Sequence, residues 1–188
     1  MCSAAPSIPA LRAFSHYIRL IQPLPSLHRC RLTPRDKNTI DLYISHQRGP
    51  FYKAEFQTEL DRKKFHIADV TDTRIFVSVM HTESLANLYV SEIYANFTQY
   101  DFVISLEQIL SYFPDGNWKY SWLEDVTEDP FTDLYRVEGL RGIYIASRVD
   151  SKTPSNHIGP EHLTSLITFD HGSTWSPINP PTEDENGM

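Results

Sequence analysis

Hydrophobic residues along this chain fall in short runs, and turn-forming residues separate the runs. Val, Ile, Tyr and Phe dominate the runs, as is typical of β-strands. Residues 106–112 are the exception: Ser105 stands three positions before Gln108, which resembles a capping box and predicts a short helix. The pattern therefore predicts an all-β chain with one short helix. The predicted strands are 40–45, 51–57, 65–68, 74–80, 88–91, 102–106, 132–137, 143–149, 165–169 and 174–178.

The clearest turn lies between the last two predicted strands. Its residues match the pattern S/T-x-D-x-G-x-T-W of the Asp-box, a motif of propeller hairpins. The Asp170 carboxylate is expected to accept backbone N–H bonds, Gly172 to take a left-handed conformation and Trp175 to pack under the hairpin. The alternative interpretation is an ordinary hairpin with an Asp-x-Gly turn. Either way the motif predicts structure and no reaction. Its residues are Thr168, Asp170, Gly172, Thr174 and Trp175.

The hairpin pattern recurs along the chain. Residues 41–45 (DLYIS) resemble 87–91 (NLYVS), and Thr168 ends a third strand of this kind. Residues 45–49 and 91–95 look like degenerate Asp-boxes, since each lacks the aspartate. Units of about 40–50 residues with four short strands are typical of propeller blades. We therefore predict an incomplete β-propeller of two to three blades, with a β-sandwich whose repeats match by chance as the alternative.

Composition divides the chain into three predicted parts. Residues 1–37 form a basic leader with one acidic residue, expected to be poorly ordered or helical, with a short helix at 10–21 or a targeting segment as specific alternatives. Residues 38–178 carry the predicted blades, and residues 179–188 form an acidic tail. Because a propeller needs about four blades to close, we expect the chain to be a piece of a larger one.

Charge and cysteine content narrow the function. A net charge of −7 argues against a nucleic-acid-binding protein, which needs a basic surface. Cys2 and Cys30 are the only cysteines, so the sequence shows no zinc motif and no disulfide framework. No apolar run approaches the ~18 residues that a membrane helix needs. Pro6, Pro9 and Arg12 interrupt any apolar core of a secretory signal.

Longer segments within residues 41–178 resemble one protein family and are more specific than the Asp-box alone. They are similar to the luminal domain of the sortilin family, the vacuolar-protein-sorting receptors. The resemblance does not extend to residues 1–37. The segments are FHIADVTDTRIFVSV (65–79), NLYVSE (87–92), SLEQILSYFP (105–114), YRVEGLRGIYIAS (135–147) and LITFDHGSTW (166–175).

The resemblance implies a segment of a large propeller whose tunnel binds propeptides and other peptide or protein ligands. In such receptors a cysteine-rich module, one membrane span and a cytosolic tail with sorting signals follow the propeller. The receptors cycle between Golgi, endosome and plasma membrane. The expected function is therefore that of a luminal fragment of a sorting receptor, anchored in the membrane only through parts absent from this chain. No tunnel residue of the family can be matched to a position here, so the ligand-binding residues stay unassigned.

Three further groups of residues bear on chemistry. Asn96 begins an Asn-Phe-Thr sequon, which predicts glycosylation in a secretory lumen.

Acidic residues cluster in 124–133; a solvated loop is favoured over a Ca²⁺ site or a contact for basic peptides, because no Asp-x-Asp-x-Asp-Gly loop is present. The spacings of His157, His162 and His171 suit no helical zinc pair, so no metal site is predicted. The acidic residues are Glu124, Asp125, Glu128, Asp129 and Asp133.

The sequence predicts no enzyme and no cofactor. It contains no Gly-x-Ser-x-Gly elbow and no phosphate-binding glycine loop. One alternative is a fragment of a sialidase-like glycosidase, since those enzymes also carry Asp-boxes; however, their Arg-Ile-Pro segment is missing, and Arg74-Ile75 is followed by Phe76. The other alternative is a non-catalytic structural or interaction propeller. A cysteine-rich module and a membrane span farther along the reading frame would favour the receptor.

Overall fold

The computed structural model describes residues 28–34, 40–46, 48–58, 64–82, 85–92, 99–114, 116, 118, 121–154 and 157–178. Several predicted features lie outside these residues, namely the helix at 10–21, the tail at 179–188, Cys2 and the sequon at Asn96. The described chain is dominated by strands, as the hydrophobic pattern predicts.

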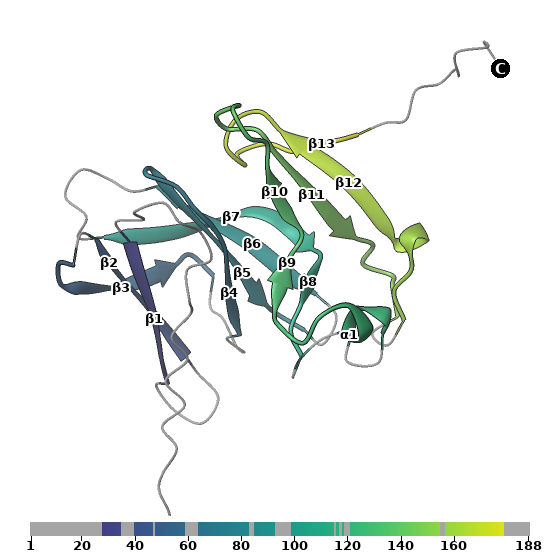
Figure 1. The fold of residues 1–188 in the computed structure, drawn as a ribbon, viewed down its shortest axis with the longest axis horizontal. Helices are drawn as coiled ribbons and strands as arrows, with labels where there is room; N and C mark the ends of the chain where they lie inside the picture. The colour runs from purple at the N-terminus through teal and green to yellow at the C-terminus, as the bar shows by residue number, and fades with distance from the viewer. Residues whose placement is uncertain are drawn as a thin grey trace, which may run out of the picture.

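The strands form three antiparallel units, which we call blades 1, 2 and 3 (Figure 1). Blade 1 contains β1 (His28–Pro34), β2 (Ile40–His46) and β3 (Phe51–Phe56). Blade 2 contains β4 (Phe65–Val70), β5 (Arg74–Met80), β6 (Ala86–Glu92) and β7 (Tyr100–Ile109). Blade 3 contains β10 (Leu134–Arg136), β11 (Tyr144–Val149), β12 (Leu163–Thr168) and β13 (Ser176–Pro177).

Short elements connect blade 2 to blade 3 and β11 to β12. Strands β8 (Ser111–Tyr112) and β9 (Phe131–Thr132) pair with each other. Helix α1 (Trp122–Val126) lies between them in the chain, and a 3₁₀ turn (Pro160–His162) precedes β12. The side chain of Ser121 caps α1 by accepting a hydrogen bond from the Leu123 amide, as Ser does at helix N-termini.

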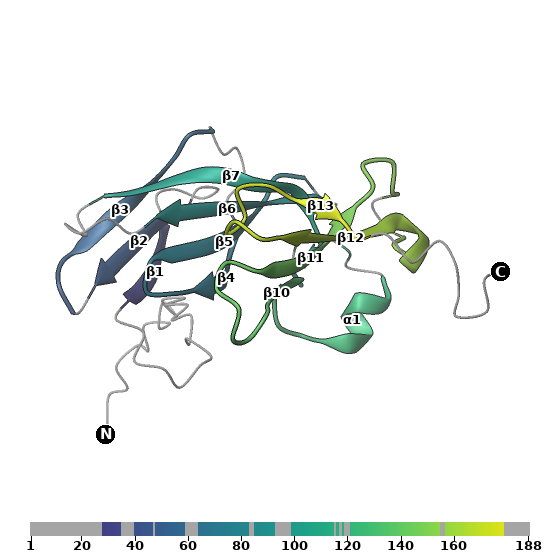
Figure 2. The same ribbon diagram turned by 90° about the horizontal axis from the view of Figure 1, so that it is seen from above.

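The blades follow one another and do not close into a ring. The path of paired strands runs β1-β2-β3-β7-β11-β12-β13. Strand β3 pairs in parallel with the start of β7, and β11 touches the end of β7 at Arg148 and Ile109. Figure 2 shows the same strands from above, with blade 2 between the other two blades. The structure thus confirms an all-β, incomplete propeller.

Two hydrophobic clusters hold neighbouring blades together. The first joins blade 1 to blade 2 and includes Ile44, Val77 and Tyr89. The second joins blade 2 to blade 3 and includes Phe76 and Leu166. Strand β5 contributes to both clusters, because alternate side chains of a strand point to opposite faces of its sheet. That position explains its unbroken run of apolar and small residues, which is typical of strands that are buried on both sides.

Two predictions need correction. Composition places residues 28–34 in a leader that is poorly ordered or helical, but they form β1, which pairs residue by residue with β2 from His28–His46 to Pro34–Ile40. The predicted helix at 106–112 is also wrong, since these residues continue β7 and form β8. In both places pairing with another strand outweighs the local signal, as strand formation often does.

Candidate functional site at the Asp170 turn

The turn between β12 and β13, residues 169–175, is organised around one carboxylate. Asp170 Oδ1 accepts hydrogen bonds from the Thr174 amide at 2.8 Å and the Thr168 hydroxyl at 2.7 Å. Its Oδ2 accepts a bond from the Thr174 hydroxyl at 2.6 Å. The Thr174 hydroxyl and amide, together with the Thr168 hydroxyl, lower the pKa of Asp170 to about 2. The charged carboxylate is therefore the form that this turn stabilises.

Thr168 completes the turn from the strand side. Its hydroxyl oxygen accepts hydrogen bonds from the amides of Gly172 at 3.0 Å and Asp170 at 3.3 Å while it donates to the carboxylate. Gly172 has φ 84°, in the left-handed region that favours glycine. His171 also lies in this region, with φ 60°. The spacing of the motif predicts the left-handed glycine, but nothing in the sequence indicates the left-handed histidine.

The turn docks on blade 2 through two polar side chains. Ser105 in β7 donates its hydroxyl proton to the Gly172 carbonyl at 2.6 Å. Arg74, at the start of β5, donates to the His171 carbonyl at 3.4 Å and also forms an ion pair with Glu92 in β6. These bonds cross from one blade to the next, so the Asp170 turn is part of the joint between blades 2 and 3.

Apolar contacts complete this joint. The indole of Trp175 is partly buried against the cluster between blades 2 and 3, and its Nε1 donates to Ser105 Oγ at 3.2 Å. A Cβ on Gly172 would lie 2.7 Å from Ser105 Oγ and 3.0 Å from a ring carbon of Phe76. The absence of a side chain at Gly172 therefore lets the turn approach blade 2 closely.

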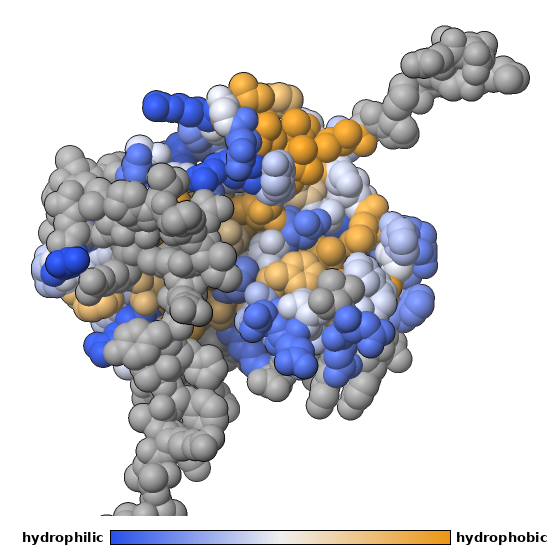
Figure 3. Space-filling view, viewed as in Figure 1, coloured by the Kyte–Doolittle hydropathy of each residue, from blue (hydrophilic) through white to orange (hydrophobic). Residues whose placement is uncertain are grey.

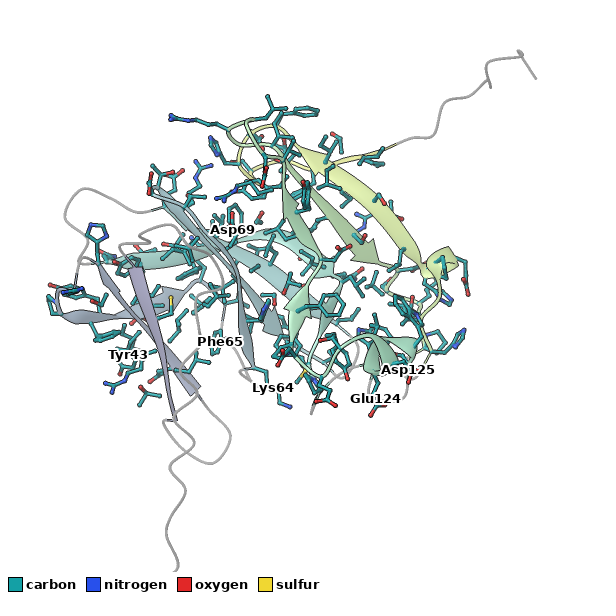
Figure 4. The ribbon with its side chains drawn as sticks, viewed as in Figure 1. Tyr43, Lys64, Phe65, Asp69, Glu124 and Asp125 are labelled. Atoms are coloured by element: carbon teal, nitrogen blue, oxygen red, sulfur yellow. The ribbon has the colours of Figure 1, made fainter. Side chains whose placement is uncertain are left out.

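A second polar contact joins the first strand of blade 2 to the first two strands of blade 3. The Tyr144 hydroxyl in β11 donates to Asp69 Oδ2 in β4 at 3.0 Å, and Arg136 in β10 lies 3.5 Å from the same oxygen. Burial, followed by the charge of Asp69, raises the pKa of the Tyr144 hydroxyl. Figure 4 labels Asp69 on β4, on the side of blade 2 near β10.

A hydroxyl network joins blade 2 to the connecting strands β8 and β9. Thr132 Oγ1 contacts His66 Nδ1 at 2.9 Å, Ser78 Oγ at 2.6 Å and Ser111 Oγ at 3.1 Å. Ser111 donates to Thr132. A threonine hydroxyl has one proton, which the ring nitrogen of a neutral His66 can accept. Burial lowers the pKa of His66 to about 4, so the neutral imidazole is the form that fits.

A shallow groove of about 370 Å³ runs beside the turn. One wall is five consecutive residues of β7, 104–108, and the remaining lining residues are Arg148, Ser173 and Trp175. No sequence pattern indicates this groove, because it forms between segments far apart in the chain.

The other chemical candidates from the sequence do not come together into one site. Glu124 and Asp125 lie exposed on α1, as Figure 4 shows, and Glu128 and Asp129 are also exposed. The described residues contain no group of three or more acidic, histidine or cysteine side chains that could hold a metal ion. Four of the five acidic side chains of the cluster are thus exposed, and Asp133, at its end, is partly buried.

The three histidines are divided between two places. The rings of His157 and His162 lie 5.9 Å apart, centre to centre, and His162 Nδ1 accepts a hydrogen bond from the Gly159 amide at 3.0 Å. His171 belongs to the Asp170 turn, where its ring covers Gly142. This arrangement gives no shared ligand position.

The first degenerate turn shows what the lost aspartate changes. Ser45 corresponds to Thr168 in the repeat, and its hydroxyl donates to the Gly49 carbonyl at 2.7 Å. The Gly49 amide donates to the His46 carbonyl at 2.7 Å. This turn is thus closed by backbone bonds and one hydroxyl among its described residues, without a carboxylate at its centre.

An open series of blades, with the Asp170 turn docked between blades 2 and 3, defines a segment of a larger propeller, and sequence comparison identifies which kind. Residues 29–188 match the family model Sortilin-Vps10, described as "Sortilin, neurotensin receptor 3". The chain belongs to the Sortilin-Vps10 family. The matched region begins within β1, so the family resemblance reaches into the residues that composition alone places in the leader.

Individual relatives agree with this assignment. The chain is 33% identical to the human sortilin-related receptor over 150 residues, which are 80% of this chain and 6% of that protein. It is 24% identical to the vacuolar protein sorting/targeting protein 10 of Talaromyces stipitatus over 157 residues, which are 82% of this chain and 10% of that protein. It is also 24% identical to the mouse VPS10 domain-containing receptor SorCS1 over 149 residues, 77% of this chain and 10% of that receptor.

The chain therefore spans only a small part of each of these relatives. Their names describe receptors and a sorting protein, not enzymes. Within the described residues, no helix is long and apolar enough to cross a membrane.

Proposed function

We propose that this chain is a blade segment of the luminal, ligand-binding domain of a transmembrane sorting receptor. Membership of the Sortilin-Vps10 family carries the proposal. Three successive blades that do not close agree with it, because the remaining blades of a ring would have to come from further sequence. The proposed role is non-catalytic: it holds part of a propeller whose interior binds protein or peptide ligands for Golgi–endosome trafficking.

Within this role, the Asp170 turn acts as an Asp-box that fixes one blade against the next. Its carboxylate satisfies the amide and hydroxyl of Thr174, and its outer carbonyls receive Ser105 and Arg74 from blade 2. A propeller that encloses a ligand needs blades held in a fixed angular relation. The Asp170 turn fixes this angle between blades 2 and 3.

The proposed location is the luminal side of Golgi and endosome and the outer face of the plasma membrane. N-glycosylation of Asn96 is part of this proposal, because the sequon is used only in a secretory lumen. A shift in gel mobility on treatment with an endoglycosidase, abolished by Asn96→Gln, is the expected result in secretory cells. An unmodified chain that has demonstrably entered the secretory lumen would contradict the glycosylation and leave the blade assignment intact.

The decisive experiment has two steps. The coding sequence on both sides of residues 29–178 is determined, and the whole ectodomain is then expressed. We expect further blade repeats, a cysteine-rich module and a membrane span. We also expect the ectodomain to capture a propeptide, supplied as a synthetic biotinylated peptide. A reading frame that closes a propeller with no membrane span, or one that adds the arginine set of a glycosidase, would overturn the proposal.

A further inference from the structure

The last strand of each blade has a position that corresponds to Ser105. In blade 2, the Ser105 hydroxyl donates to the Gly172 carbonyl of blade 3. Ser105 stands two positions after Val103, which pairs with Val90 in the ladder. The matching ladder pairs of blades 1 and 3 are Ile44–Tyr52 and Ile167–Ser176. Counting two positions onward from these pairs gives the equivalent residues of blades 1, 2 and 3 as Ala54, Ser105 and Ile178.

Arg74 is the second residue of blade 2 that holds the Asp170 turn, because it donates to the His171 carbonyl. Its equivalent in blade 3 is Ile143. Both residues stand directly before the matching ladder pairs of their blades, Ile75–Ser91 and Tyr144–Thr168. Blade 3 thus has isoleucine at both docking positions, and an isoleucine side chain cannot donate a hydrogen bond.

The aromatic residue after each turn matches the residue on the preceding blade. Trp175 Nε1 donates to Ser105 Oγ at 3.2 Å. By the same count along the strands, the corresponding residues of blades 1 and 2 are Ala54 and Phe102, which both belong to the hydrophobic cluster of that joint. Phe102 has no ring N–H and Ala54 has no hydroxyl. The joint between blades 1 and 2 is therefore apolar at the position where the next joint is hydrogen-bonded.

The central residue of the turn varies in the same way. Asp170 is the centre of the turn that docks on Ser105. The corresponding residue of blade 2 is Ile93, two positions after Ser91, and the preceding blade has Ala54 at the docking position. The central carboxylate is thus present in the turn after a blade that offers a hydroxyl, and absent from the turn after a blade that offers a methyl group.

A physical reason connects the carboxylate to the docking residues. The bonds that Asp170 accepts hold the turn in the shape that directs the carbonyls of His171 and Gly172 toward blade 2. Arg74 and Ser105 satisfy these two carbonyls. Against side chains that cannot donate, the same shape would leave both carbonyls without a partner on the neighbouring blade. Buried carbonyls without partners cost free energy, so a different turn is favoured there.

The surface of blade 3 is apolar where a following turn would dock. Ile178 is 44% exposed, and Phe169, which takes the place of Glu92, is 68% exposed. Figure 3 shows hydrophobic residues gathered around β13 and the turns at that end of blade 3. The charged Asp133 lies at the opposite end of β11, where its carbonyl accepts from the Ser147 amide. The docking end of this surface therefore fits an apolar partner.

We propose that the blade after blade 3 docks on Ile143 and Ile178 through a turn that has no central aspartate and packs apolar side chains on blade 3. The inference rests on the proposed function, which supplies the following blade. It assigns the chemistry of that partner from the surface that receives it. Successive joints then differ, and a turn built around a carboxylate fits only a blade that offers donors.

Variants of the 188-residue chain test the link between the carboxylate and the docking pair. Arg74→Met combined with Ser105→Ala removes both donors and keeps most of the side-chain volume. In this background Asp170→Asn should lower the melting temperature by less than it does in the parent chain, because the two carbonyls have already lost their partners. Asp150→Asn, in an exposed turn, should have the same effect in both backgrounds. Equal losses from Asp170→Asn in both backgrounds would overturn the proposal.

The sequence of the following blade is a second test, which does not require the double variant to fold. The residue two positions after the equivalent of Thr168 should not be an aspartate. An intact S/T-x-D-x-G-x-T-W turn in that blade would overturn the inference and leave the receptor assignment intact. A reading frame without a following blade would overturn both.

The expressed ectodomain tests the docking position directly. Ile178→Lys should lower the melting temperature of the ectodomain, where the following turn covers residue 178, and should change that of the 188-residue chain much less, since Ile178 is exposed there. Ser151→Lys, at an exposed turn, is the control and should leave both melting temperatures unchanged. Equal shifts from Ile178→Lys in the two proteins would show that the following turn docks elsewhere, which would overturn the proposal.

Discussion

The Ser105 hydroxyl of blade 2 donates to the Gly172 carbonyl of blade 3 at 2.6 Å, across 67 residues of sequence. The same oxygen accepts the indole proton of Trp175 at 3.2 Å. One small side chain therefore links the backbone of the Asp170 turn to the aromatic ring that packs beneath it. The relationship makes Ser105 a positioning residue for the whole turn.

Ser105→Ala should weaken the joint, because it leaves the Gly172 carbonyl and the Trp175 indole without this partner. The expected loss in the free energy of unfolding is about 1–2 kcal/mol, the usual cost of unsatisfied groups of this kind. Chemical denaturation of the full chain measures it, with the exposed Ser151→Ala as control. In a double-mutant cycle with Trp175→Phe the two losses should not add; strict additivity would show that the two residues act separately.

Gly172→Ala should destabilise the chain more than Gly139→Ala. Both glycines have positive φ, 84° and 77°, so both substitutions incur the backbone strain of about 1–3 kcal/mol. A methyl group on Gly139 meets nothing within 4 Å, whereas one on Gly172 meets Ser105 and Phe76. The difference between the two melting temperatures isolates the close approach between blades. Equal losses would mean that blade 2 moves aside at no cost.

Strand β5 and the Asp170 turn can be predicted from the sequence, because the residues that determine them are neighbours in the chain. A run of mainly β-branched and aromatic residues predicts a strand at residues 74–80, and β5 has those bounds. The hydrogen bonds around Asp170 follow from motif spacing, since the partners lie within four residues of the carboxylate. The repeats indicate blades because each blade buries the same positions.

The remaining features depend on partners that a local pattern does not contain. Strand β1 includes Arg29 and Arg31, so by composition its residues resemble a basic leader. Only the pairing with β2 shows that they form a strand. The false helix at 106–112 arises from a capping-box spacing. In the structure, Gln108 has φ 60° and its amide donates to the Asn87 side chain, which a helix would not allow. The docking of the Asp170 turn by Ser105 and Arg74 joins residues that no spacing rule connects.

Asp170→Asn should lower the melting temperature at neutral pH, because an amide cannot accept from both the Thr174 hydroxyl and the Thr168 hydroxyl as the carboxylate does. The pKa of Asp170 is lowered from 3.8 to about 2, so its contribution is complete above pH 3.8 and disappears as the pH falls toward 2. Thermal melts should therefore show the gap between parent and variant closing over that range. Asp150→Asn, at an exposed turn with one amide bond, is the control; a gap that is constant down to pH 2 would contradict the role of the charge.

His66 should make the contact between blade 2 and strand β9 sensitive to acid in a higher pH range than Asp170. Burial lowers its pKa from 6.5 to about 4, so the folded chain binds this proton less readily than the unfolded chain does. The stability that the neutral ring contributes is complete above pH 6.5 and is lost as the pH falls to 4. One pKa unit corresponds to about 1.4 kcal/mol, so the full loss is roughly 3 kcal/mol.

His66→Gln tests this dependence, because the glutamine carbonyl can still accept from the Thr132 hydroxyl but does not titrate. Urea unfolding at a series of pH values should give a steep fall in stability between pH 6.5 and 4 for the parent and a flatter curve for the variant. His157→Gln, at an exposed histidine, should reproduce the parent curve. Parallel curves for the parent and His66→Gln would show that His66 binds its proton as readily in the folded chain as in the unfolded chain, which would contradict the lowered pKa.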